Sequence, residues 1–223
     1  MMSRRTSLAV FVVLFGVVGA CKSEPGTAET KDKPVEATRE LAGVWPEQFK
    51  CDSIAAPDVL GPVLGGSARQ VDNPAPIQKG LAHPCVYEVN GGQLTDAGVP
   101  VFAYWTFDFD CRDNYKKTAD ALFDQYRRQN ADLVAKYDEM SDAGAIKPTD
   151  AGIEMHRPGE SSDVQVGAKA LDHHGQGLLF IDDDAPCYVR VVGPDNARRL
   201  ELAKLIAKNL TIKNAPMSPR ALN

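Results

Sequence analysis

The sequence predicts an α+β fold: an antiparallel sheet with a short N-terminal helix, one long central helix and a C-terminal helix, braced by disulfides. Three observations support this prediction. Apolar and polar residues alternate over residues 99–110, as in a strand with one buried face. Apolar residues recur at helical spacing over 113–138 and again over 195–210. Turn-forming segments separate the apolar strands, which favours hairpins and antiparallel pairing. We expect the helices to cover one face of this sheet.

The first elements lie between residues 56 and 110. Residues 56–66 ("APDVLGPVLGG") predict a short helix, with Asp58 near its start and two glycines at its end. Residues 85–89 ("CVYEV") predict a strand, and Gly91-Gly92 predicts the turn that follows it. The long strand over 99–110 comes next.

The two faces of the long strand differ in character. One face carries Val101, Ala103, Trp105, Phe107, Phe109 and, just beyond the strand, Cys111. We assign this face to the core, so Trp105 is interpreted as a packing residue and not as part of a ligand groove. Asp108 and Asp110 point to the other face. There we expect solvated surface and not a catalytic carboxylate pair.

The second half of the chain supplies two helices and a hairpin. The helix over 113–138 has an apolar stripe, with a possible bend at Gln129-Asn130. Short strands are predicted around 153–156 and 164–166. Residues 177–193 predict a hairpin whose two apolar arms are joined by residues 182–186. The inward positions of the last helix are predicted to be Leu200, Ala203, Ile206, Ala207 and Leu210.

The N-terminus has the pattern of a secretory signal peptide. Arg4 and Arg5 precede an uncharged apolar run of 13 residues over 8–20. That run is too short for a spanning helix, which needs about 20 residues. Small residues close the run. Residues 1–20 are therefore predicted to be a signal peptide.

The segment Val18-Gly19-Ala20-Cys21 resembles the lipobox of bacterial lipoproteins. The resemblance implies cleavage before Cys21 and acylation of its thiol with fatty acids such as palmitate. Each buried CH₂ contributes about 0.8 kcal/mol, so two or three chains anchor a protein firmly. In enteric lipoproteins Asp after the cysteine means inner-membrane retention, so Lys22 favours the outer membrane over the inner one. The domain would then lie outside the cytoplasm, in the cell envelope.

The rest of the chain divides into three parts. Residues 21–43 are rich in Lys, Glu, Thr and Pro, and are expected to be the lipidated Cys and a disordered tether. The 22 residues after Cys21 would average about 25 Å end to end if coil-like. Residues 44–213 suit a single α+β domain. Residues 214–223 are expected to be a flexible tail.

Charge limits the possible partners. The formal net charge is −5, and it becomes −7 when the two arginines of residues 1–20 are removed. Such an acidic chain has no electrostatic footprint for nucleic acid, so we expect no nucleic-acid partner. The membrane would be reached through the lipid anchor, and an envelope protein is a possible partner.

The cysteine count supports an oxidising compartment. With Cys21 used by the anchor, four of the five cysteines remain, which allow three disulfide connectivities. We favour Cys51–Cys85 and Cys111–Cys187, because Cys111 and Cys187 both share a strand face with apolar residues. Each bridge would contribute about 2–4 kcal/mol. The sequence has no CxxC pair for redox chemistry or zinc.

The body of the chain resembles the small cell-wall lipoproteins of high-GC bacteria that have a PsbP-like α+β fold. The resemblance rests on "CDSIAAPDVLGPVLGG", "PCVYEV" and "VQVGAKALDHHGQGLLFIDDDAPCYVRVVG" before a terminal helix, and it covers most of residues 48–210. The long helix over 113–138 and the second cysteine pair depart from that family. Most members have no known activity, so the resemblance implies a fold more than a function.

Two polar segments are candidate metal sites. His173 and His174 are adjacent in "LDHHGQG", and His156 is the third weak candidate ligand. Neighbouring residues in a strand point to opposite faces, so we favour a polar turn at His173-His174. The three aspartates at 182–184 lack the spacing of a calcium loop, so we interpret them as turn residues.

No catalytic motif is present: the sequence has no GxSxG, HExxH, Walker or GxGxxG pattern. We therefore expect a membrane-tethered, non-enzymatic lipoprotein with no cofactor, which binds an envelope protein or a small ligand. The alternative is a metal-assisted hydrolase of the cell envelope, using His173 or His174, His156 and an aspartate.

Overall fold

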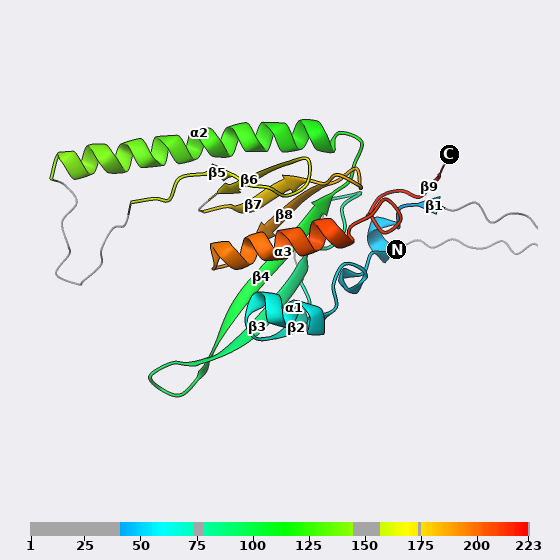
Figure 1. Ribbon diagram of the computed structural model, residues 1–223, viewed down its shortest axis with the longest axis horizontal. Helices are drawn as coiled ribbons and strands as arrows, with labels where there is room; N and C mark the ends of the chain where they lie inside the picture. The colour runs from blue at the N-terminus through cyan, green and yellow to red at the C-terminus, as the bar shows by residue number, and fades with distance from the viewer. Residues whose placement is uncertain (1–40, 74–77, 145–156, 174, 223) are drawn as a thin grey trace, which may run out of the picture. The chain divides into compact units, whose positions relative to one another are not determined.

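The computed structural model describes residues 41–73, 78–144, 157–173 and 175–222, which Figure 1 shows as ribbons. In chain order the elements are β1 (Leu41–Ala42), the 3₁₀ turns η1 (Pro46–Gln48) and η2 (Cys51–Ser53), α1 (Pro57–Leu64), β2 (Ser67–Val71), β3 (Cys85–Leu94), β4 (Pro100–Asp110), α2 (Tyr115–Asp142), β5 (Ser162–Asp163), β6 (Lys169–His173), β7 (Gly177–Ile181), β8 (Tyr188–Val192), α3 (Asn196–Asn209) and β9 (Arg220–Ala221). The fold is α+β with a short, a long and a C-terminal helix, as predicted.

The main sheet has seven strands in the order β2-β3-β4-β8-β7-β6-β5, and every neighbouring pair is antiparallel. β7 and β8 form the predicted hairpin, and residues 182–186 connect them. β6, which the sequence analysis did not predict, pairs with β7. The prediction of a strand at 164–166 is wrong: β5 ends at Asp163, and residues 164–166 belong to no strand. The predicted strand at 153–156 lies outside the described residues.

Local sequence signals fix the helix ends. α1 begins with Pro57, whose ring suits the first helical position, and ends at Gly65, which has φ +84°. In α3, the carboxylate of Asp195 accepts a hydrogen bond from the backbone N–H of Arg198 at 2.8 Å. The helices therefore begin and end close to where the sequence placed them.

Helices cover both faces of the sheet, which corrects the expectation of one covered face. Figure 1 shows α2 along one side of β6–β8 and α3 along the other. Along β7, Leu178 and Phe180 join the core cluster that includes residues of α1 and α3. Leu179 and Ile181 join the cluster that includes residues of α2. β7 is consequently buried at all five positions.

The long central helix has buried residues only from Ala119 to Asn130. Ala119, Phe123 and Tyr126 are buried against the sheet, whereas Leu133 of the same predicted stripe is 51% exposed. α2 is continuous through the predicted bend. Asn130 is buried and holds the chain at 159–161, donating to the carbonyl of Gly159 and accepting from the N–H of Ser161.

The β3–β4 hairpin differs from its prediction. β3 continues through Gly91-Gly92, with an irregularity in its pairing to β4 between residues 90 and 94. The turn lies instead at 95–99, where the Thr95 N–H donates to the carbonyl of Val99 at 2.8 Å. The hairpin is therefore longer than the sequence predicted, and it extends beyond the rest of the sheet in Figure 1.

The two ends of the described chain pack together. β1 pairs with β9 in a separate two-stranded sheet. Ala215 and Met217 are buried. Residues 214–222 thus pack on the domain, where a flexible tail was expected over 214–223. The first described strand, β1, likewise begins at Leu41, inside the predicted tether of 21–43.

Candidate binding pocket

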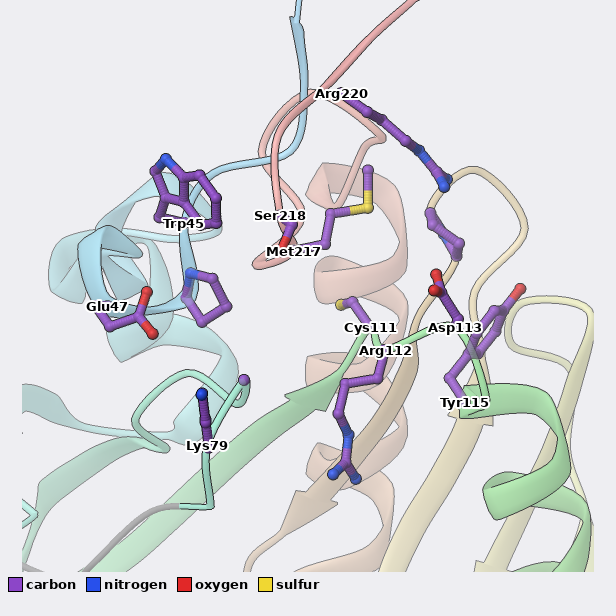
Figure 2. A pocket seen from close by; sticks show the side chains of 13 residues that line it. Trp45, Glu47, Lys79, Cys111, Arg112, Asp113, Tyr115, Met217, Ser218 and Arg220 are labelled. Carbon is purple, nitrogen blue, oxygen red and sulfur yellow. The ribbon is translucent and has the colours of Figure 1, made fainter.

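A pocket of about 520 Å³ lies beside the disulfide between Cys111 and Cys187. Its lining comes from segments that are far apart in the sequence, namely residues 45–47, 79–80, 111–115, 186 and 217–220. Figure 2 shows two groups of side chains on either side of it, Trp45, Glu47 and Lys79 in one and Asp113, Tyr115 and Arg220 in the other.

Pairing of the two chain ends builds one wall of this pocket. β9 places Arg220 opposite Ala42 of β1. The backbone N–H of Val44 donates to the carbonyl of Ala215 at 2.9 Å, which holds the segment before Trp45 against the C-terminal segment. Residues that are about 175 positions apart in the sequence therefore meet at one site.

The disulfide builds the opposite part of the pocket. Cys111 follows the last residue of β4, and Cys187 precedes the first residue of β8. The bond thus fixes the ends of two paired strands next to the start of α2, where Tyr115 and Asp113 lie. A second disulfide, Cys51–Cys85, joins η2 to the start of β3. Both pairings match those favoured from the sequence.

Four charged side chains around the pocket have no bonding partner among the described residues. Within the described residues, Glu47, Lys79, Asp113 and Arg220 make no ion pair or side-chain hydrogen bond. Arg112 differs, because its guanidinium donates to the Asp110 carboxylate at 2.9 and 2.6 Å. The pocket therefore offers two cations and two anions to a ligand.

The apolar part of the pocket is largely aromatic and sulfur-containing. Trp45 is 48% exposed, while Met217 is 7% exposed. An exposed indole beside unpaired polar groups can give a ligand both contact area and directional hydrogen bonds. The arrangement suits a small polar molecule that has an apolar face.

Asp108 and Asp110 do not form the solvated surface that the sequence predicted. The Asp108 carboxylate accepts two hydrogen bonds from Arg190, at 3.0 and 2.9 Å. Asp110 is 6% exposed and paired with Arg112. Burial raises the pKa of Asp108 above its ordinary value, although Arg190 opposes this effect. Both carboxylates therefore serve ion pairs with arginines that are only partly buried.

His173 lies inside the fold and not in an open site. It is 4% exposed, its ring packs edge-on against Tyr126, and its Nδ1 accepts backbone hydrogen bonds from Gly175 and Gln176 at 3.0 and 3.2 Å. His174 and His156, the other weak metal candidates, lie outside the described residues. Within the described residues no group of three or more His, Cys, Asp or Glu side chains is placed to hold a metal ion.

The aspartate run at 182–184 forms a turn, as interpreted from the sequence. The Asp182 carboxylate accepts hydrogen bonds from the backbone N–H groups of Asp184 and Ala185 at 3.1 and 2.7 Å. Burial raises the pKa of Asp182 to about 6, and the two backbone hydrogen bonds oppose that rise. Asp183 and Asp184 are exposed.

Sequence reasoning missed this pocket. It gave no weight to Lys79 or Arg220. These residues have no informative spacing, because the pocket exists only once β1 and β9 pair. Cys21 lies outside the described residues.

Comparisons with known proteins give no relative. No family model matches this chain, and neither the curated proteins nor the solved structures include a significant match. In the described part of the chain, no helix has both the length and the apolar character needed to cross a bilayer.

Proposed function

We propose that this chain is a membrane-tethered lipoprotein that lies outside the cytoplasm and binds a ligand without catalysing a reaction. The observation that carries this proposal is the use of the cysteines. The structure pairs four of the five cysteines in two disulfides, and the one that remains is Cys21. That residue closes the predicted signal peptide, where an acylated cysteine is expected.

The disulfides support the location. Such bonds persist in oxidising compartments and are rare in the reducing cytosol. Each involves at least one cysteine at the end of a core strand, so the pairing suits an environment in which disulfides form. This agrees with export of the chain and with a domain in the cell envelope.

The pocket beside Trp45 supports a binding role. Its charged side chains are free to contact a ligand, and its floor is fixed by a disulfide and by the β1–β9 pair. We propose that the ligand is a small polar molecule. The surroundings of His173 favour this role over the metal-assisted hydrolase, since its ring lies beneath α2 and its Nδ1 is occupied by two backbone N–H groups.

The lipid anchor is tested by intact mass spectrometry of the chain purified from membranes. The expected product begins at Cys21 and carries the mass of a diacylglyceryl group with or without a third acyl chain. The control is Cys21→Ser, which should leave the precursor uncleaved and without lipid. An unmodified thiol at Cys21 in the mature protein would refute the proposal.

Fractionation tests the membrane. Lys22 after the anchor leads us to propose the outer membrane, and the control variant Lys22→Asp should shift the protein toward the inner membrane. Recovery of the unaltered protein in the inner membrane would contradict this part alone.

A further inference from the structure

The outer end of the β3–β4 hairpin is an exposed apolar arm, which we define as residues 90–104. Residues 90–102 are all exposed. Among the described residues eleven large hydrophobic side chains are exposed, and five of them lie on this arm: Leu94, Val99, Val101, Phe102 and Tyr104. Exposed apolar side chains gathered on one element in this way often mark a site of contact with another molecule.

The arm also has an open strand edge. β3 pairs with β4 from Phe102 to Phe107 and again at Pro100, whereas β8 pairs with β4 only from Thr106 to Asp110. On the side opposite β3, no other described strand pairs with residues 100–105. Their main-chain N–H and C=O groups on that side can accept a further strand.

Proteins commonly protect such an edge with charged residues, and this edge has few. Between residues 90 and 107 the only charged residue is Asp96, which lies in the turn. The sheet's two outermost strands are shorter than β4: β2 has five residues, with the charged Arg69 among them, and β5 has two. The β4 edge is thus the longest uncharged edge of the described sheet.

We propose that this edge pairs with the same edge of a second copy, giving a twofold dimer through an antiparallel β4–β4 contact. A twofold contact places a surface against itself, so it disfavours any patch with a net charge. The chain as a whole carries a net charge of −5, so copies of it repel each other elsewhere. The edge of β4 at residues 100–105, which has no charged residue, is therefore a surface on which two copies can approach at low electrostatic cost.

The side chains suit this pairing. In a continuous antiparallel sheet, directly opposed residues lie on the same face. Phe102 and Tyr104 lie on one face of β4, and Val101 and Ala103 lie on the other. Any antiparallel register within residues 100–105 consequently opposes uncharged side chains, and aromatic residues meet on the outer face. This inference does not depend on the lipid anchor or on the pocket beside Trp45.

Sedimentation of the full chain tests the proposal, in detergent with micelles in large excess over protein so that shared micelles do not mimic a dimer. We expect a reversible monomer–dimer equilibrium at micromolar concentrations. Phe102→Lys and Tyr104→Lys each place two like charges in the contact, and each should raise the dissociation constant by at least about tenfold. The matched control is Leu133→Lys, at a 51% exposed position on α2, which should leave the constant unchanged.

Hydrogen exchange gives a second measurement that needs no variant. Those backbone amides of residues 101–104 that point to the open edge should become protected as the protein concentration rises, while those of the exposed turn at 95–99 should not. If the unaltered protein stays monomeric up to about 100 µM, the proposal is overturned. Binding of another envelope protein to the arm of such a monomer also overturns it. A Leu133→Lys effect equal to that of Phe102→Lys overturns it as well.

Discussion

β7 and the outer end of β4 are both apolar segments of one sheet, but their surroundings differ. All five residues of β7 are buried, since α3 covers one face and α2 the other. Residues 100–104 of β4 are mostly exposed and have no described strand on one edge. Apolar residues therefore serve two purposes in this sheet. In β7 they stabilise the core, and in the arm we propose that they contact a second copy.

The comparison also explains how the long strand changes along its length. Trp105, Phe107 and Phe109 are at most 3% exposed, whereas Val101 on the same face is 41% exposed. The alternation of apolar side chains along β4 continues beyond the part of the strand that other elements cover. Alternation in a sequence thus predicts the faces of a strand, but not how far along the strand those faces are covered.

Truncating one phenylalanine in each region should give the largest contrast. Phe180→Ala leaves a cavity at a fully buried position of β7, and we expect it to reduce the free energy of unfolding by about 3–5 kcal/mol. Phe102→Ala on the arm, where the side chain is 41% exposed, should cost less than about 1 kcal/mol. Urea unfolding with intact disulfides measures both under monomeric conditions. Equal costs would contradict the comparison.

Two arginines make the same contrast for ion pairs. Arg199 is 4% exposed, and its guanidinium donates to Asp172 and to the carbonyl of Gly193, each at 2.9 Å. Arg199→Ala leaves the Asp172 carboxylate largely buried without its partner, so we expect a loss of about 3 kcal/mol.

The control is Arg69→Ala near the arm, which removes an ion pair with Glu88. The Arg69 side chain is 72% exposed, so the loss should stay below about 1 kcal/mol. Urea midpoints of the two variants, measured side by side, test the difference. If Arg69→Ala lowered the free energy of unfolding more than Arg199→Ala does, the region near the arm would contribute more to stability than its exposure indicates.

Much of the fold could be predicted because its signals are local. Helical spacing gave α2 and α3, Asp58 and the two glycines at 65–66 bounded α1, and strand alternation placed Cys111 and Cys187 on faces that could meet. Which face of the sheet α2 covers could not be predicted, because an apolar stripe fits either face. Gly91-Gly92 was misread as a turn, since glycine marks turns and strand irregularities alike.

The candidate pocket could not be predicted for a different reason. Its residues carry no shared spacing, and Arg220 reaches the site only through the β1–β9 pair. The segment that contains Arg220 is short and polar, which normally predicts a frayed end. Its packing depends on buried Ala215 and Met217, whose contacts come from distant parts of the chain.

The turn that closes the β7–β8 hairpin should make stability depend on pH. Asp182 has its pKa raised from 3.8 to about 6 by burial, so the folded state holds a proton that the unfolded state has already released. Stability from this group is therefore present below about pH 4 and is lost as pH rises to about 6.

Asp182→Asn keeps an oxygen for the backbone N–H groups of Asp184 and Ala185 but removes the charge. We expect it to raise the free energy of unfolding at pH 7 by about 3 kcal/mol and to have little effect near pH 3.5. Asp108, whose pKa is also raised, remains in both proteins, so the difference between them isolates Asp182. A variant whose advantage is equal at both pH values would contradict this assignment.

The two tryptophans provide the smallest effect and separate the pocket from the core. Trp45 is 48% exposed at the pocket, whereas Trp105 is 1% exposed, so acrylamide should quench only Trp45. Trp45→Phe should remove most of the quenchable emission and change the free energy of unfolding by less than about 0.5 kcal/mol. Quenching of the unaltered protein should weaken when a ligand fills the pocket, because the indole then loses contact with solvent. Strong quenching that persists in Trp45→Phe would mean that Trp105 is accessible and that the buried face of β4 opens in solution.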